Sequence, residues 1–296
     1  MRFGLQASRV STLQELRSTL SWAEQSGFEA VYWPDHLMGT PLAVGPTLAT
    51  AAQLSSRLRL GSLVYANDFR HPLLLARELA TLQLLSGGRM VCGLGTGWQE
   101  SEYRATGLAL DPPGLRLSRL EEAVALLKRA WSGQTFSFSG EHYQVSEFVC
   151  SPSVAPPLLM LGGGGRRLLS LAARQADGVN FNARLGPEFD LYTDQRLAEQ
   201  VEWVREQAGG RFHQLRLSLP VYYGAVGPDT RAAQEVAALG RGFTPEQAAR
   251  SPLFLFGSLE QVRERLSELT ERFGIGQVIL SQYGCDLESL ASVVSN

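Results

Sequence analysis

An acid and an imidazole stand next to each other early in the chain, in the sequence Trp33-Pro34-Asp35-His36. A histidine that is held by a carboxylate can keep one tautomer and can donate or accept a proton near neutral pH. The alternative is structural, because Asp35 can cap the following turn while His36 packs beside it. The pair therefore indicates either a catalytic His36 or an ordinary turn.

A second chemical signal is the run of glycines at 162–165, which follows an apolar segment and leads into Arg166 and Arg167. Glycine amides let an anion approach without a Cβ in the way, and the dipole of a following helix favours negative charge. The run lacks the Gly-Lys-Ser/Thr of a Walker loop and does not match a dinucleotide fingerprint. A flexible turn with both arginines in water is the alternative. We favour a phosphate site formed by Gly163, Gly164, Arg166 and Arg167.

Small residues also follow an earlier apolar segment, in Gly95-Thr96-Gly97-Trp98. A planar ring can lie close to backbone that carries little side chain, with the tryptophan as one wall of its site. Tight packing at the end of a strand would select glycine equally well. This stretch is therefore compatible with a ring-binding site and with ordinary packing.

These residues follow short apolar segments that alternate with amphipathic stretches along nearly the whole chain. The alternation is typical of repeated strand–helix units around a parallel sheet, and eight such units predict a closed (β/α)8 TIM barrel of the α/β class. In such a barrel the reactive residues lie where strands end. The expected strands are 3–6, 30–33, 58–64, 90–94, 158–161, 178–181, 215–223 and 277–281.

Two segments interrupt this pattern. Residues 135–145 alternate around Ser139-Gly140 and predict a small hairpin inserted after the fourth strand. Residues 224–256 predict a long loop and helical segment before the last helix. No linker divides the chain, so we expect a single domain over residues 1–296.

Composition restricts the partners of this protein. The 296 residues carry a net charge of −2 without a basic block, which argues against nucleic acid and favours a small-molecule substrate. No segment is apolar for long enough to cross a membrane, and the start lacks the apolar core of a signal peptide, so we expect a cytoplasmic protein. The three cysteines are far apart and form no CxxC pair, so neither a disulfide framework nor a metal site is expected.

Together these motifs resemble the bacterial luciferase-like superfamily, and more narrowly its branch that uses the deazaflavin coenzyme F420. The resemblance runs from residue 1 to about 290. Besides the motifs above, it rests on Asn67-Asp68-Phe69-Arg70-His71-Pro72, on Ser86-Gly87-Gly88-Arg89 and on Ala176-Asp177-Gly178. It implies a TIM-barrel enzyme with the cofactor ring in the mouth of the barrel, and a homodimer.

The resemblance also assigns roles to single residues. It implies that Asp35 contacts the deazaflavin head, that His36 is the proton donor, and that the Leu63-Val64 peptide bond is cis. Thr96 and Gly97 would line the ring, and the glycine run would hold the phosphate. The implied cofactor site comprises Asp35, Leu63, Val64, Ala66, Thr96, Gly97, Ser101, Gly163, Gly164, Arg166 and Arg167.

The chain departs from the sugar-phosphate dehydrogenases of that branch at three positions. Trp98 stands where those enzymes have a glutamate, Ser101 stands for an asparagine that contacts the cofactor, and Ala66 stands for a threonine. Their acid/base pair is thus incomplete here, which argues against glucose 6-phosphate as the substrate. The cofactor assignment then depends mainly on Asp35, His36 and the phosphate loop.

A deazaflavin has carbon in place of the reactive flavin N5, so it transfers hydride and reacts poorly with oxygen. We therefore expect an F420-dependent oxidoreductase that reduces a C=C, C=N or C=O bond while His36 supplies the proton. Trp98, Phe181 and Tyr222 predict a fairly apolar substrate pocket. The alternatives are an FMN-dependent monooxygenase, which the same phosphate loop can serve, and a non-catalytic flavin-binding or subunit protein.

Overall fold

Eight parallel strands close into a barrel in the computed structural model, which describes residues 1–183, 192–239 and 243–294. Strand β8 pairs with β9 and thereby joins the two ends of the sheet. Every strand expected from the sequence is present, within a few residues at each end. The barrel strands are β1 (Arg2–Gln6), β2 (Ala30–Trp33), β3 (Arg59–Ala66), β4 (Met90–Gly95), β7 (Leu158–Gly163), β8 (Gly178–Phe181), β9 (Arg216–Val226) and β11 (Gln277–Cys285).

Alternation along the strands separates an inner from an outer hydrophobic cluster. On β7, Met160 belongs to a small cluster to which several strands contribute side chains, whereas Leu159 and Leu161 belong to the large cluster beneath the helices. Successive side chains of a strand point to opposite faces, so one set fills the barrel and the other supports the helices. The inner cluster consists of Ala30, Tyr32, Leu63, Val91, Met160 and Ile279.

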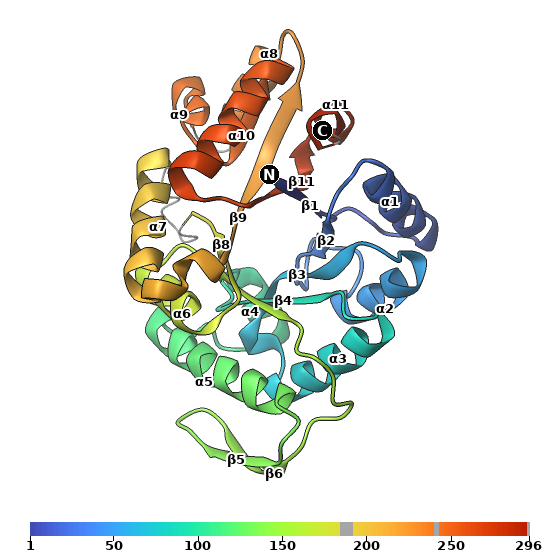
Figure 1. The fold of residues 1–296 in the computed structure, drawn as a ribbon, viewed down its shortest axis with the longest axis vertical. Coiled ribbons are helices and arrows are strands. Elements are labelled where there is room, and N and C mark those ends of the chain that lie inside the picture. Colours follow the sequence, from blue (N-terminus) through green and yellow to red (C-terminus); the bar gives the residue numbers. More distant parts are fainter. Residues whose placement is uncertain (184–191, 240–242, 295–296) are drawn as a thin grey trace.

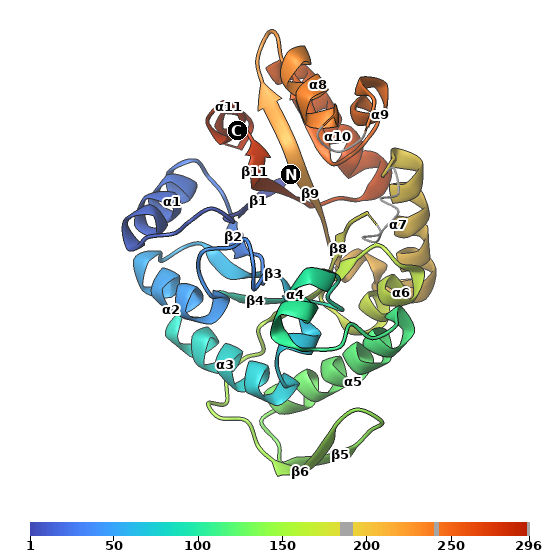
Figure 2. The ribbon, with the colours of Figure 1, turned by 180° about the vertical axis from the view of Figure 1, so that it is seen from behind.

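Helices surround the barrel on its outside (Figure 1), and the view from behind shows the same ring (Figure 2). Several begin with a polar side chain that accepts a hydrogen bond from a first-turn amide, as Thr12 and Ser258 do. The main helices are α1 (Leu13–Gln25), α2 (Val44–Leu54), α3 (Pro72–Leu85), α5 (Pro113–Trp131), α6 (Arg166–Gln175), α7 (Asp194–Ala208), α10 (Leu259–Phe273) and α11 (Leu287–Val294). Within the described ranges, no helix combines the length and the apolar character needed to cross a membrane.

Shorter elements occupy the connections. The predicted hairpin is present as β5 (Phe136–Ser139) and β6 (Gln144–Phe148), and it projects from the barrel below α5 in Figure 1. The short helix α4 (Glu100–Thr106) follows β4. Two 3-10 turns, Asn67–Phe69 and Gly209–Gln214, complete the connections.

In its described residues, the segment around 224–256 contains more regular structure than the sequence indicated. It contains α8 (Arg231–Leu239), α9 (Pro245–Ala249) and an unexpected strand, β10 (Phe254–Gly257). Strand β9 extends beyond the barrel, where β8 has ended, and β10 pairs with that extension in parallel. The rings of Tyr223 and Phe254 stack with centroids 5.3 Å apart. This pairing satisfies backbone groups of β9 that would otherwise lie at an open edge.

Candidate functional site

His36 and Glu102 form a close pair at the carboxyl end of the barrel. His36 follows β2, and Glu102 belongs to α4 after β4. The Nδ1 atom of His36 lies 3.2 and 3.3 Å from the two carboxylate oxygens of Glu102, whose side chain is only 2% exposed. The same carboxylate accepts a hydrogen bond from the backbone N–H of Met38 at 3.0 Å. Because a carboxylate accepts hydrogen bonds, Nδ1 is the donor of the pair and Nε2 stays available to a substrate.

Trp98 stands beside this pair on the connection between β4 and α4. Its ring meets the imidazole of His36 edge-on, with centroids 6.0 Å apart and planes at 89°. Trp98 is 46% exposed, and the side chains of Leu37 and Met38 are exposed to a similar extent. Trp98 is thus a large apolar side chain that contacts the imidazole of His36.

Asp35 ties the ends of two neighbouring strands together. Its carboxylate accepts hydrogen bonds from both terminal nitrogens of Arg70, at 2.6 and 2.9 Å, and from the backbone N–H of Ala66 at 3.1 Å. The Arg70 guanidinium also lies over the ring of Tyr65. Asp35 is therefore the partner of Arg70 and not of His36, although the two residues are adjacent in sequence. Its contact with a deazaflavin stays a prediction.

The Leu63-Val64 peptide bond is cis, which confirms that expectation. The side chain of Val64 fits only because neighbouring strand positions are glycines. A Cβ on Gly95 or on Gly162 would lie 2.7 Å from a methyl group of Val64. Tight packing therefore accounts for these two glycines, while the role of Leu63 and Val64 in backing a cofactor ring stays a prediction.

Polar side chains hold the Thr96-Gly97 backbone in place. The Tyr103 hydroxyl donates to Asp68 at 3.0 Å and lies 3.4 Å from the carbonyl oxygen of Thr96, while Arg116 donates to the carbonyl oxygen of Gly97. Burial and the neighbouring Asp68 carboxylate raise the pKa of Tyr103 well above its ordinary value. Gly97 has a φ of +74°, and a Cβ there would collide with the Tyr103 hydroxyl. The conformation of the Thr96-Gly97 backbone is therefore fixed by the protein itself, before any ligand binds.

The glycine run ends β7 and leads directly into α6. Gly165 is the N-cap of α6 and offers no side chain to the first-turn amides, and a Cβ there would meet nothing within 4 Å. The carbonyl oxygen of Gly164 accepts a hydrogen bond from the buried Gln200 at 3.1 Å, which anchors the loop. Uncapped amides, open space and the adjacent Arg166 and Arg167 suit a phosphate group. These residues fit the phosphate of a flavin or deazaflavin cofactor.

The three predicted substrate-pocket residues separate in the structure. Trp98 is exposed beside His36, as described above. Phe181 is fully buried in the outer core beneath the helices and so does not line the mouth of the barrel. Its two neighbours in the chain have the opposite orientation: Asn180 on β8 donates to Ser218, and Asn182, just after the strand, donates to the hydroxyl of Tyr222 at 2.9 Å. The prediction that Phe181 lines a substrate pocket is therefore wrong, because a uniformly buried strand gives no sign of which of its faces points into the barrel.

Several residues of the site could not be identified from the sequence. Glu102 is 66 positions from His36 and belongs to no motif. Ser101, its neighbour on α4, accepts a hydrogen bond from Gln99 at 3.3 Å and stays a predicted cofactor residue. Arg70 and Tyr103 act through partners that are about 35 residues away in the chain. A carboxylate on a short helix at a strand end is a weak signal that could have indicated Glu102.

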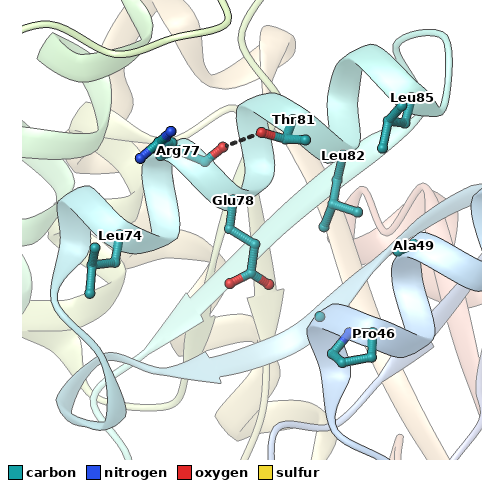
Figure 3. Close-up of a pocket in the computed structure, with 9 residues that line it drawn as sticks. Pro46, Ala49, Leu74, Arg77, Glu78, Thr81, Leu82 and Leu85 are labelled. Atoms are coloured by element: carbon teal, nitrogen blue, oxygen red, sulfur yellow. Dashed lines mark hydrogen bonds between the residues drawn. The ribbon is translucent and has the colours of Figure 1, made fainter.

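Of two cavities in the described part of the chain, one lies away from the predicted site and the other borders its phosphate loop. The larger one, of about 520 Å³, lies between α2 and α3 and is lined by Pro46, Leu74, Glu78 and Leu85 among others (Figure 3). The smaller one, of about 300 Å³, is lined by residues of α5 and α6.

In the described ranges no three His, Cys, Asp or Glu side chains gather as a metal site would require. The expected homodimer stays a prediction.

Comparison with known proteins identifies relatives of this chain. It is 34% identical over 224 residues to an F420-dependent glucose-6-phosphate dehydrogenase of Nakamurella multipartita, a match that covers 73% of this chain and 65% of the relative. It is also 34% identical over 173 residues to an F420-dependent hydroxymycolic acid dehydrogenase of Mycobacterium tuberculosis, covering 55% of this chain and 47% of the relative. The chain thus matches about half to two thirds of these curated relatives.

Among solved structures, an F420-dependent secondary alcohol dehydrogenase in complex with an F420-acetone adduct has the same fold. The TM-score is 0.80 at 16% identity, over 100% of this chain and 99% of that one. The sequence profile described as luciferase-like monooxygenase matches residues 1–272. With its closed barrel, its cis peptide bond at β3 and its glycine run before α6, this chain belongs to the luciferase-like monooxygenase family.

Proposed function

We propose that this protein is an oxidoreductase that transfers hydride between coenzyme F420 and an uncharged organic substrate. The observation that carries the proposal is the His36–Glu102 pair, which stands at the same end of the barrel as an uncapped helix N-terminus suited to a phosphate. The named relatives that use F420 support this choice of cofactor. The deazaflavin would supply the hydride chemistry, and the protein would bind, orient and move the proton.

The residues divide these tasks. The first-turn amides of α6, with Arg166 and Arg167, would hold the phosphate, and the Thr96-Gly97 backbone would border the ring. In reduction, the carbon of a C=O, C=N or C=C bond gains a hydride and its partner atom gains a proton from His36 Nε2. In oxidation the same bonds break in reverse, and Nε2 accepts the proton. The Glu102 carboxylate stabilises the imidazolium form in both directions, because it faces Nδ1 at hydrogen-bond distance.

The surroundings of His36 favour an uncharged substrate. The exposed ring of Trp98 provides an apolar surface beside the imidazole, and the adjacent residues Leu37 and Met38 are exposed apolar side chains. The nearby Arg70 is committed to Asp35. Arg116 is committed to backbone carbonyl oxygens of the 96–97 loop. A phosphorylated sugar would need a cation that these arginines do not offer.

Binding and turnover test the proposal separately. Titration of the purified protein with F420 and with FMN, followed by the fluorescence of each cofactor, should show binding of F420 at micromolar concentration. Binding of FMN alone would replace the proposal with a flavin-dependent monooxygenase. His36→Ala should bind F420 normally but lose most turnover of a secondary alcohol or ketone, measured by the visible absorption of oxidised coenzyme. Full turnover by His36→Ala would end the proton-transfer role.

A further inference from the structure

Three arginines line a cleft that begins beside the phosphate loop and continues along the outside of α6. The cleft is the smaller cavity described above. The two helices whose residues line it, α5 and α6, lie side by side (Figures 1 and 2). Its lining consists of Arg166, Arg167, Ser170 and Arg174 from α6 and Glu121 from α5. Three guanidinium groups thus face a single carboxylate.

Helical spacing places part of this lining in one row. Arg167, Ser170 and Arg174 are three and four residues apart, so they share one face of α6. Seven residues of helix rise by about 10 Å, which carries the row two turns away from the N-terminus of α6. A group held by the first-turn amides therefore lies at one end of the row, and Arg174 lies at the other.

The charges of the row are largely uncompensated. Within the described part of the chain, the Arg167 guanidinium makes no hydrogen bond or ion pair, and Arg174 donates only to the amide oxygen of Gln207 at 3.0 Å. Arg166 has an exposed partner, Glu206, at 3.5 Å. Guanidinium groups that lack carboxylate partners and line a common cleft are suited to bind carboxylate groups, each through two parallel N–H hydrogen bonds.

We infer that this cleft binds a carboxylate-bearing chain that continues beyond the phosphate of the cofactor. The inference rests on the proposed function. Coenzyme F420 carries such a chain, because its phosphate leads into a lactyl group and γ-linked glutamates, whereas FMN ends at its phosphate. The phosphate loop suits both cofactors, but a row of arginines that extends past the loop serves only the longer, anionic one. The cleft is thus a feature of this chain that distinguishes F420 from FMN.

The test compares two forms of the coenzyme, one with several glutamates and one that ends at the phospholactyl group. Dissociation constants are measured by fluorescence for the wild-type protein and for Arg174→Ala, which lies far from the phosphate loop. Two exposed ion pairs should make the long form bind about three- to tenfold more tightly than the short form. Arg174→Ala should reduce this advantage without changing the affinity for the short form, and added salt should reduce it too.

Arg17→Ala is the matched control, because Arg17 is an exposed arginine on α1, away from the cleft. It should leave both dissociation constants unchanged. Equal binding of the long and short forms to the wild-type protein would overturn the inference while leaving F420 as the cofactor. Failure of both forms to bind, with binding of FMN, would overturn the proposed function and this inference together.

Discussion

Replacement of Glu102 by glutamine should strongly slow oxidation of the substrate, the direction in which His36 accepts the proton. Glutamine has almost the same shape and keeps an oxygen for the N–H of Met38, but it removes the negative charge that faces His36 Nδ1 at 3.2 and 3.3 Å. A hydrogen bond to a charged group contributes about 1.5–3 kcal/mol to the state that carries the charge. In oxidation, where His36 gains the proton, loss of that stabilisation from the developing imidazolium corresponds to a chemical step about 10- to 150-fold slower.

Single-turnover kinetics measure this step directly. Enzyme in excess over coenzyme is mixed with substrate, and the visible absorption of the deazaflavin reports hydride transfer before product release. The dissociation constant of the coenzyme should not change, since Glu102 is on α4 and not on the phosphate loop. Glu100→Gln is the matched control, because Glu100 is an exposed acid at the start of the same helix.

The result that refutes this reasoning is specific. If Glu102→Gln were folded, bound coenzyme normally and transferred hydride within twofold of the wild-type rate, the carboxylate would have no role in proton transfer. Glu102→Asp provides a further check, because it restores the negative charge at a greater distance. Its rate should fall between those of the wild type and Glu102→Gln.

Three further predictions concern the framework of the site. Gly97→Ala should lower the free energy of unfolding by about 1–3 kcal/mol and weaken coenzyme binding, because a Cβ at φ +74° meets the Tyr103 hydroxyl; urea denaturation and fluorescence titration measure both, and unchanged values would contradict it. Asp35→Ala should cost about 3 kcal/mol of stability by leaving Arg70 without its partner, also measured in urea; a loss below about 0.5 kcal/mol would contradict it. Burial raises the pKa of Cys285 to about 12, so its thiol stays protonated at pH 8 and should react with a disulfide reagent much more slowly than in the unfolded chain; equal rates would contradict this.

The barrel could be predicted from the sequence because its signal is local and repeated. Each strand is a short apolar segment, each helix has its own periodicity, and eight repeats leave few alternatives to closure. Strand β10 was missed for the opposite reason. Phe254–Gly257 is only four residues long and becomes a strand through its pairing with the extension of β9, which no local pattern reveals.

The candidate site was predictable only in part. The glycine run before α6 and the position of His36 follow from residue types that are unusual at strand ends. The sequence did not reveal which residue each charged side chain pairs with. Asp35, the neighbour of His36 in sequence, pairs with Arg70, whereas His36 pairs with Glu102 from another connection.

The sequence by itself determined the order and type of the elements, the places where the chain needs glycine, and the presence of a histidine and a glycine run at strand ends. Only the tertiary structure decided which carboxylate serves His36, which face of β8 is inner, and that the arginines of α6 line one cleft with Glu121. The physical reason is the distance along the chain over which each kind of interaction acts. Periodicity and turn chemistry act over a few residues, whereas closure of the barrel brings together strand ends that are separated by tens of residues in the chain.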